Sequence, residues 1–286
     1  MTAMEGILEQ LRTLNETLER IAPKPLPEID FSEAAFRWSR LESGATLVAV
    51  PRKRPSRLQD LCGIDRQKTE LERNTRQFLK GLPCNNALLW GSRGTGKSSL
   101  IRALLDTYRE QGLRMIEVDR THLSDFPDIC RQISGRPERF ILFLDDLAFE
   151  ENDGSFKTLK ATLEGSLAEI PDNLLIYATS NRRHLMPEFI DENKATRVIR
   201  SELHHGESVE EKISLSERFG VWLSFHPFTQ DQYLEIVEHW IRRLGSSDPI
   251  AELREEALAH ALLRGSRSGR VAYQFAKDWI GRKGLV

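Results

Sequence analysis

The segment at residues 88–100, LLWGSRGTGKSSL, constrains the fold of this chain more than any other. It fits the pattern GxxxxGK[ST], with Gly91, Gly96, Lys97 and Ser98 at the fixed positions. An apolar run precedes the pattern and helix-forming residues follow it. A strand, a glycine-rich loop and a helix in this order turn backbone N–H groups and the positive helix end toward phosphate oxygens. The alternative, a glycine-rich turn that matches by accident, does not explain these flanks. The segment therefore predicts a phosphate-binding loop.

We expect this loop to hold a nucleoside triphosphate and Mg²⁺. Lys97 would reach the β and γ phosphates, and the Ser98 hydroxyl would bind the metal ion. The residues expected to bind the nucleotide here are Gly91, Ser92, Arg93, Gly94, Thr95, Gly96, Lys97, Ser98 and Ser99.

The sequence FILFLDD at residues 140–146 supplies two carboxylates at the end of an apolar strand. Ligands of parallel α/β sheets bind at the carboxyl ends of the strands, so these acids point to the same site. We expect Asp145 to hold Mg²⁺, directly or through water, and Asp146 to polarise the attacking water. A simple boundary between strand and loop is the alternative, and the preceding phosphate-binding loop argues against it.

Three later residues are candidates for contacts with the phosphates. Asn181 follows the apolar run LLIYATS and either orients the water or contacts the γ phosphate, or else caps a turn. Arg218, in LSERFG, is either a surface arginine or a group that stabilises the transition state in a neighbouring subunit. Arg270, in SRSGRVAYQF, opens the last helical segment and would reach back to the phosphates.

Composition limits the classes of partner. The net charge of −2 gives no global basic field that would draw the chain onto nucleic acid. No apolar run has the length of a membrane span, so we expect no membrane partner. The odd number of cysteines and their wide spacing suit reduced thiols, and we expect a cytoplasmic protein. These cysteines are Cys62, Cys84 and Cys130.

The N-terminal region predicts a helix with one apolar stripe. Apolar residues recur at spacings of three and four, at Met4, Ile7, Leu11, Leu14, Leu18 and Ile21. The stripe is short for a coiled coil, so both docking on its own domain and pairing between subunits stay open. We expect a second helix at 31–41, a short strand at 45–50 and a basic linker at 51–57. The linker is either solvated or a contact with nucleic acid or an acidic partner.

From residue 58 onward, strands alternate with helices, which predicts a parallel sheet with helical crossovers. Besides the strand before the loop, the expected strands are 113–119, 140–144, 174–179 and 221–225. The expected helices are 68–79, one that Ser124 would cap, one that ends at residue 170, and three at 230–244, 250–263 and 270–280. We therefore expect an N-terminal helical extension and linker at 1–57, an α/β nucleotide-binding domain at 58–227 and a helical lid domain at 228–286.

Residues 191–211 are polar and weakly periodic, which predicts a long loop or insertion. The loop contains His204 and His205, a pair that would suggest a metal site if further ligands stood nearby. No cysteine or carboxylate has the required spacing, so we expect a polar loop without metal.

The ordered motifs GSRGTGKS, FILFLDD, ATSN, SERFG and SGRVAYQF resemble those of AAA+ ATPases. More narrowly, residues 30–286 resemble a bacterial AAA+ family catalogued as a domain of unknown function. The resemblance implies a P-loop NTPase fold with a three-layer parallel sheet, together with ATP, Mg²⁺ and a homo-oligomeric ring or arc when nucleotide is bound. SERFG followed by SGRV is also similar to the branch of Holliday-junction branch-migration motors and clamp loaders.

The resemblance also implies roles for individual residues. Lys97 and Ser98 match Walker A, while Asp145 and Asp146 match Walker B. Asn181 matches sensor 1, Arg218 the arginine finger and Arg270 sensor 2, and Ile64 would lie against the adenine. Most AAA+ proteins have Glu where this chain has Asp146, and the shorter acid would hold water less closely, so hydrolysis is expected to be slow. Arg182 and Arg183 are alternative fingers.

Three functions remain open at this point. The first is an oligomeric Mg²⁺-dependent ATPase that remodels or loads a protein or nucleic acid. The second is a nucleotide-dependent binding switch with slow hydrolysis. The third is a DNA-processing or helicase-loader-like factor. The sequence alone names no substrate.

Overall fold

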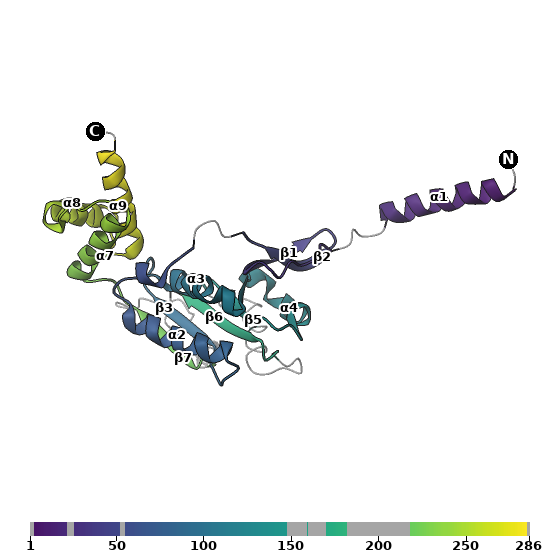
Figure 1. Ribbon diagram of the computed structural model, residues 1–286, viewed down its shortest axis with the longest axis horizontal. Coiled ribbons are helices and arrows are strands. Elements are labelled where there is room, and N and C mark those ends of the chain that lie inside the picture. The colour runs from purple at the N-terminus through teal and green to yellow at the C-terminus, as the bar shows by residue number, and fades with distance from the viewer. Residues whose placement is uncertain are drawn as a thin grey trace, which may run out of the picture.

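The computed structural model describes residues 3–21, 26–51, 55–147, 159, 170–181 and 218–284. Element labels follow Figure 1. The expected linker residues 52–54, most of the helix that ends at 170, the candidate fingers Arg182 and Arg183, and the loop 191–211 with its two histidines lie outside the described residues.

Within the described residues, a seven-stranded sheet forms the centre of the molecule (Figure 1). Its strand order is β2-β1-β4-β5-β6-β3-β7, and every neighbouring pair is parallel except β1 and β2. The strands are β1 Ala35–Leu41, β2 Gly44–Ala49, β3 Ala87–Gly91, β4 Leu113–Glu117, β5 Arg139–Leu144, β6 Leu174–Ser180 and β7 Val221–Phe225. The order confirms the expected parallel sheet with crossovers.

Helices cover both faces of this sheet. They are α2 Asp65–Leu79, α3 Lys97–Tyr108 and α4 Phe126–Ile133, with 3-10 helices η1 Leu58–Asp60, η2 Arg109–Gln111 and η3 Arg120–Asp125. Alternate residues of β5 enter different cores: Ile141 and Phe143 share one with α2 and α3, while Leu142 and Leu144 share the other with α4. Burial on both faces explains why these strands are continuously apolar.

Three further helices form a group at one end of the molecule (Figure 1). They are α7 Gln230–Arg243, α8 Ile250–Leu263 and α9 Gly269–Lys283, close to the expected bounds. α7 begins with a capping box, in which the Thr229 hydroxyl accepts from the Gln232 N–H and the Gln232 side chain accepts from the Thr229 N–H. The buried Tyr233 hydroxyl donates to the Ala257 carbonyl and joins α7 to α8. These helices carry the residues that close the site described below.

The prediction of a helix at 31–41 is wrong. Residues 35–41 form β1, and its register places Phe36 and Trp38 in the core while Arg37 is exposed. This alternation has the period of a strand, and pairing with both β2 and β4 satisfies its backbone. The short strand expected at 45–50 is confirmed as β2.

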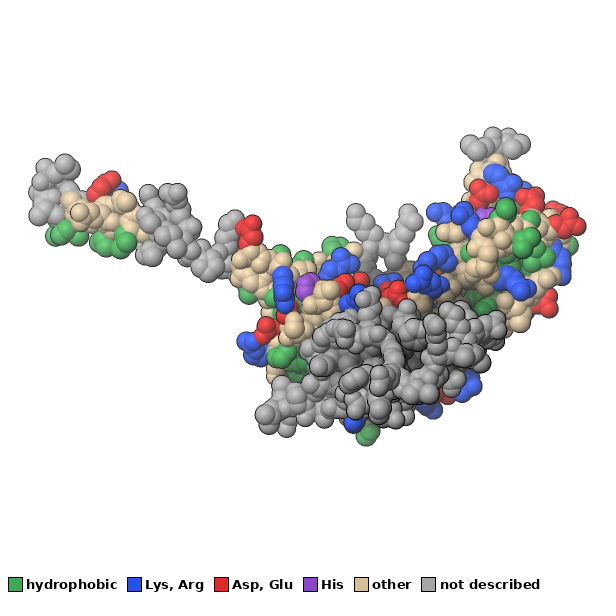
Figure 2. Space-filling view, turned by 180° about the vertical axis from the view of Figure 1, so that it is seen from behind, with side chains coloured by type: hydrophobic (Ala, Val, Ile, Leu, Met, Phe, Trp, Pro, Cys, Tyr) green, Lys and Arg blue, Asp and Glu red, His purple; other side chains and the backbone are tan. Residues whose placement is uncertain are grey.

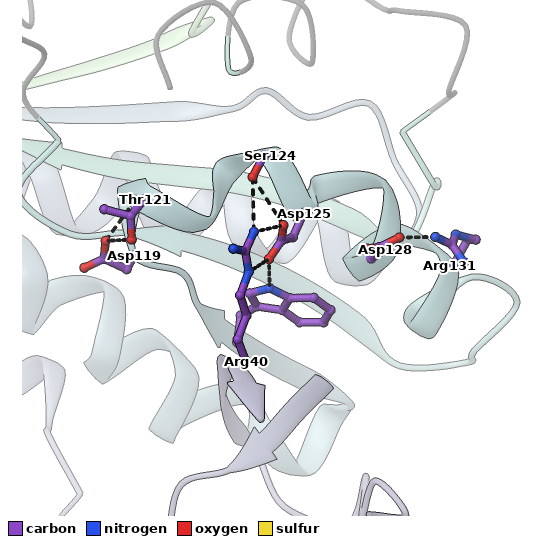
Figure 3. Close-up of polar contacts among 8 residues, drawn as sticks. Arg40, Asp119, Thr121, Ser124, Asp125, Asp128 and Arg131 are labelled. Atoms are coloured by element: carbon purple, nitrogen blue, oxygen red, sulfur yellow. Dashed lines mark hydrogen bonds and ion pairs between the residues drawn. The ribbon is translucent and has the colours of Figure 1, made fainter. Parts of the chain in front are cut away.

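The prediction that Ser124 caps a helix is also wrong. Ser124 lies inside η3, and α4 begins after Asp125 without a side-chain cap. Asp125 instead joins the hairpin to η3: it accepts from the Trp38 indole at 2.8 Å and from two Arg40 nitrogens at 2.9 and 2.6 Å (Figure 3). These bonds hold the pKa of Asp125 down at about 2, chiefly through Arg40.

Helix α1 Ala3–Ile21 confirms the expected N-terminal helix. It lies beyond the end of the sheet that carries β1 and β2 (Figure 1), and apolar side chains gather along one of its sides (Figure 2).

Candidate functional site

The strand order brings the predicted motifs to one edge of the sheet. β5, β6 and β3 are neighbours and parallel, so the segments after their carboxyl ends lie side by side. These segments carry Asp145 and Asp146, Asn181, and the glycine-rich loop. Together with α7 and α9 they line a cavity of about 680 Å³.

The glycines of the loop are required by close approaches. A Cβ on Gly91, whose φ is +124°, would lie 2.0 Å from the carbonyl oxygen of Phe225 in β7. A Cβ on Gly94, whose φ is +75°, would lie 2.8 Å from the Ser268 hydroxyl at the start of α9. Larger residues would therefore separate the loop from β7 at one point and from α9 at the other.

The Lys97 ammonium is buried among acceptors. Its Nζ donates to the carbonyls of Gly91 and Ser92 at 2.7 and 2.8 Å, and to Asn181 Oδ1 at 3.1 Å. Burial lowers the pKa of Lys97 to about 8, against the attraction of Asp146 and Asp145. A phosphate group beside this ammonium would compensate its charge.

Asp145 is held by three side chains. Its Oδ1 accepts from Ser98 Oγ at 2.6 Å and from Thr179 Oγ1 at 2.7 Å, and its Oδ2 lies 3.2 Å from Arg102 Nη2. Carboxylate and hydroxyl oxygens are the ligands that Mg²⁺ prefers, so Ser98 and Asp145 fit the predicted metal site. Arg102 neutralises the same carboxylate from the next turn of α3.

Asp146 has an unusual backbone. Its φ is +54°, and it is the one residue other than glycine with positive φ in the part of the chain that the structure describes. Asp adopts this left-handed conformation more readily than Glu, which gives a physical reason for the shorter acid here. Its carboxylate accepts a short hydrogen bond from the Asn181 amide, and Arg93 lies 3.9 Å away. Asn181 thus connects Asp146 with Lys97.

The C-terminal helices close the cavity and contact the rest of the nucleotide-binding domain at two points. The Arg270 N–H donates to the Gly94 carbonyl at 3.3 Å, and Arg270 lines the cavity. On the other side, Asp60 accepts from His239 at 3.2 Å and pairs with Arg243 at 3.3 Å. Ile64, which the resemblance places against the adenine, is buried and also lines the cavity.

Three predicted residues do not line the cavity: Gly91, Ser92 and Arg218. The first two still contribute the carbonyls that hold Lys97. Arg218 precedes the amino end of β7, whereas the site lies at the carboxyl ends of the strands. A contact between Arg218 and the phosphates would therefore need a second subunit.

Several lining residues were not predicted from the sequence. Thr179 lies two residues before Asn181, and Arg102 lies one helical turn after Ser98, so the spacing from a predicted residue was the available signal. Trp240 and Tyr273 pack against each other with ring centroids 4.6 Å apart on α7 and α9. Whether these two rings line the cavity depends on how α7 and α9 pack, and residue patterns do not specify this packing.

The described residues hold no group of three or more His, Cys, Asp or Glu side chains placed to bind a metal ion among themselves. None of their helices combines the length and apolar character needed to cross a membrane. The three cysteines are free thiols.

Comparison with known proteins gives one family and several relatives. The family described as "Protein of unknown function (DUF815)" matches residues 32–283. The large subunit of replication factor C from Sulfolobus acidocaldarius is 30% identical over 118 residues, which are 41% of this chain and 27% of that protein. The chain thus spans about a quarter of this relative.

Solved structures of RuvB from Thermotoga maritima share the fold. The RuvB Holliday junction branch migration motor has a TM-score of 0.53 at 17% identity, covering 78% of this chain and 64% of that one. Its T158V variant has a TM-score of 0.54 with the same identity and coverage. At this identity the likeness concerns the fold alone.

Proposed function

We propose, from the premise that this chain belongs to the DUF815 family and has the AAA+ ATPase fold, that it binds ATP with Mg²⁺ and hydrolyses it. The observation that carries the proposal is that two sets of side-chain hydrogen bonds meet at one cavity. Lys97, Asn181 and Asp146 form one chain of hydrogen bonds, and Ser98, Asp145 and Thr179 form the other. A phosphate-binding loop alone would serve many reactions, whereas both sets together suit hydrolysis of a phosphoanhydride.

In this proposal each group has one task. Backbone N–H groups of residues 91–98 and the Lys97 ammonium bind the β and γ phosphates. Ser98 and Asp145 would hold Mg²⁺, which when bound would supply positive charge to neutralise the phosphate oxygens. Asp146 accepts a proton from the attacking water, and Asn181 holds that carboxylate and the Lys97 ammonium in fixed positions relative to each other. Asp146 is shorter than Glu, so we propose that turnover is slow.

We further propose that the chain acts as a homo-oligomer when nucleotide is bound. Arg270 would contact the phosphates of its own subunit, since α9 already touches the loop at Gly94. Arg218 would contact the nucleotide of a neighbouring subunit, because its own site lies at the opposite edge of the sheet.

The reduced cysteines support a cytoplasmic location.

Steady-state phosphate release tests the proposal. The wild-type chain is expected to release phosphate from ATP with Mg²⁺, and Lys97→Ala should abolish the release. Activity of Lys97→Ala at the wild-type rate would refute the assignment of the site. Mixing Arg218→Ala with Lys97→Ala subunits should restore part of the activity; no recovery in intact mixed assemblies would refute a role for Arg218 in trans.

A nucleotide-dependent binding switch is the second candidate. It is favoured by Asp146, whose carboxylate is already paired with Asn181 and lies near Arg93. Asp146→Asn keeps a side chain that tolerates the left-handed backbone, so it removes the base without straining the loop. If the chain is a switch, this variant retains partner binding with ATP. Loss of function when hydrolysis alone is blocked would instead support the ATPase.

The named activity of the structural relatives, Holliday junction branch migration, leads us to propose nucleic acid as one class of partner. The net charge of −2 implies that such binding uses a local basic surface. Gel shifts with duplex and branched DNA, with and without ATP, test this proposal. Binding that falls with added salt would support it, and the absence of a shift with any nucleotide would remove it.

A further inference from the structure

None of the described residues covers the apolar stripe of α1. Met4, Ile7, Leu8, Leu11 and Leu14 are between 54 and 71% exposed. All five lie on one side of the helix, where Figure 2 shows apolar side chains gathered. Apolar residues scattered singly on a surface need no explanation, but a continuous stripe marks an interaction surface.

The described part of the chain's own domain does not cover this stripe. α1 lies beyond the end of the sheet (Figure 1), and thirteen residues of sequence, 22–34, stand between it and β1. It also precedes residues 32–283, the part that the family shares. α1 is therefore an addition to the ATPase fold rather than part of its core.

The charges of α1 argue against a lipid surface. Its sequence contains four glutamates and two arginines, a net charge of −2. Helices that bind anionic membranes carry lysine and arginine on the polar face. The polar side of α1 would be repelled by such lipids.

The pattern of the helix fits a second copy of itself. Residues 4, 7, 11, 14, 18 and 21 keep strict a and d spacing. The positions that flank this seam, e and g, decide which partners a coiled coil accepts, because they face each other across the interface. In α1 they carry no charge: they are Ala3, Leu8, Gln10, Asn15 and Thr17. Two identical helices can therefore pair without repulsion between like charges.

We propose that α1 associates with α1 of a second copy of this chain, and that this association does not require nucleotide. It goes beyond the proposed ATPase function, which concerns contacts made through the nucleotide site. The helix holds fewer than three heptads, so the association is weak and concentration-dependent. It would keep subunits together while nucleotide-dependent contacts form and break.

Sedimentation equilibrium of the full chain without nucleotide tests the proposal. The test variant is Leu11→Gln with Leu14→Gln, which places amides in the seam and keeps good helix formers. The matched control is Glu9→Gln with Thr13→Gln on the opposite side of the helix. A Lys97→Ala background removes any contribution from bound nucleotide.

We expect the average mass of the wild type and the control to rise with concentration. The seam variant should have a dimer dissociation constant at least about tenfold weaker, because the pair loses apolar burial on both helices. Persistence of the association in Lys97→Ala separates this result from failure of the ATPase proposal.

Four results would overturn the proposal. In the first the seam variant associates as the wild type does, and in the second the wild type stays monomeric at every concentration. A monomeric wild type whose melting temperature falls in the seam variant would assign α1 to its own domain. Flotation of the wild type, but not the seam variant, with vesicles of phosphatidylcholine and phosphatidylglycerol would assign it to lipid.

Discussion

Thr179 should control turnover without binding the nucleotide. Its hydroxyl donates to Asp145 Oδ1 at 2.7 Å and accepts from the Asp146 N–H at 2.9 Å. Its carbonyl accepts from the Leu147 N–H at 2.6 Å, and the residue is 1% exposed. One buried side chain therefore sets the position of both acids.

Thr179→Val removes the hydroxyl and keeps the branched shape that packs in β6. A hydrogen bond to a charged group contributes about 1.5 to 3 kcal/mol, so losing the bond to Asp145 should cost a similar amount of activation free energy. This corresponds to a decrease in kcat of roughly 10- to 100-fold. KM for ATP should change little, because Thr179 makes no contact with Lys97 that the structure records.

The assay is steady-state phosphate release at varied ATP and Mg²⁺, with thermal unfolding as a check on the fold. Thr179→Val should need more Mg²⁺ for half-maximal rate, since Asp145 loses one of the groups that orient it. Thr179→Ser restores the hydroxyl and should recover most of the rate. Wild-type kcat and Mg²⁺ dependence in Thr179→Val would refute the reasoning, as would a loss that Thr179→Ser does not rescue.

Three further predictions concern stability and the phosphate-binding loop. Asp125→Asn should lower the free energy of unfolding by about 2 kcal/mol at neutral pH, since the pKa of Asp125 falls from 3.8 to about 2 on folding. In urea unfolding, this loss of stability should shrink as the pH falls through this range. A loss that does not depend on pH would contradict the role of the Asp125 charge. The pKa of Lys97 falls from 10.5 to about 8 on folding, so as the pH rises the folded state loses this proton before the unfolded state does. Between pH 8 and 10.5 the wild type should therefore gain stability relative to Lys97→Met, while its affinity for ATP declines. Denaturant titrations that show a constant difference in stability would refute this prediction. Gly91→Ala should lower the stability more than Gly112→Ala does. Both glycines have positive φ, but an added Cβ meets Phe225 only at residue 91. Equal melting temperatures of the two variants would argue against this steric cause.

Residue patterns were sufficient to predict the structure where one motif determines both the conformation of a segment and the segments that lie beside it. The glycine-rich loop predicts strand, loop and helix at once, and the apolar strand before Asp145 predicts burial on both faces. Because parallel strands end at one edge, the order of motifs also predicts that these residues meet. The parallel sheet followed from this reasoning, whereas the AAA+ fold was implied by the resemblance of the ordered motifs to that superfamily.

Patterns failed where pairing between distant segments decides the conformation. The aromatic residues Phe36 and Trp38 suit either a helix or a strand, and pairing of β1 with β4, far along the chain, selects the strand. Thr179 was missed for a related reason. A threonine at the end of a strand is common, and only the register of β6 against β5 places its hydroxyl between Asp145 and Asp146.

The orientation of α1 shows a third limit. Its seam was evident from the sequence, but the choice between its own domain and a second copy depends on where α1 lies relative to the sheet. The structure separates α1 from the sheet, and this separation is what makes the proposed association testable.

The central claim is that the cavity lined by Lys97, Asp145 and Asp146 binds ATP with Mg²⁺. Titration calorimetry of the full chain tests it most directly, with Lys97→Ala as the site variant. Arg131→Gln is the control, since Arg131 lies on α4 and pairs with Asp128 outside the cavity. We predict saturable binding to wild type and control, and affinity at least about tenfold weaker for Lys97→Ala. Absence of binding to wild type, or equal affinity for Lys97→Ala, would contradict the claim.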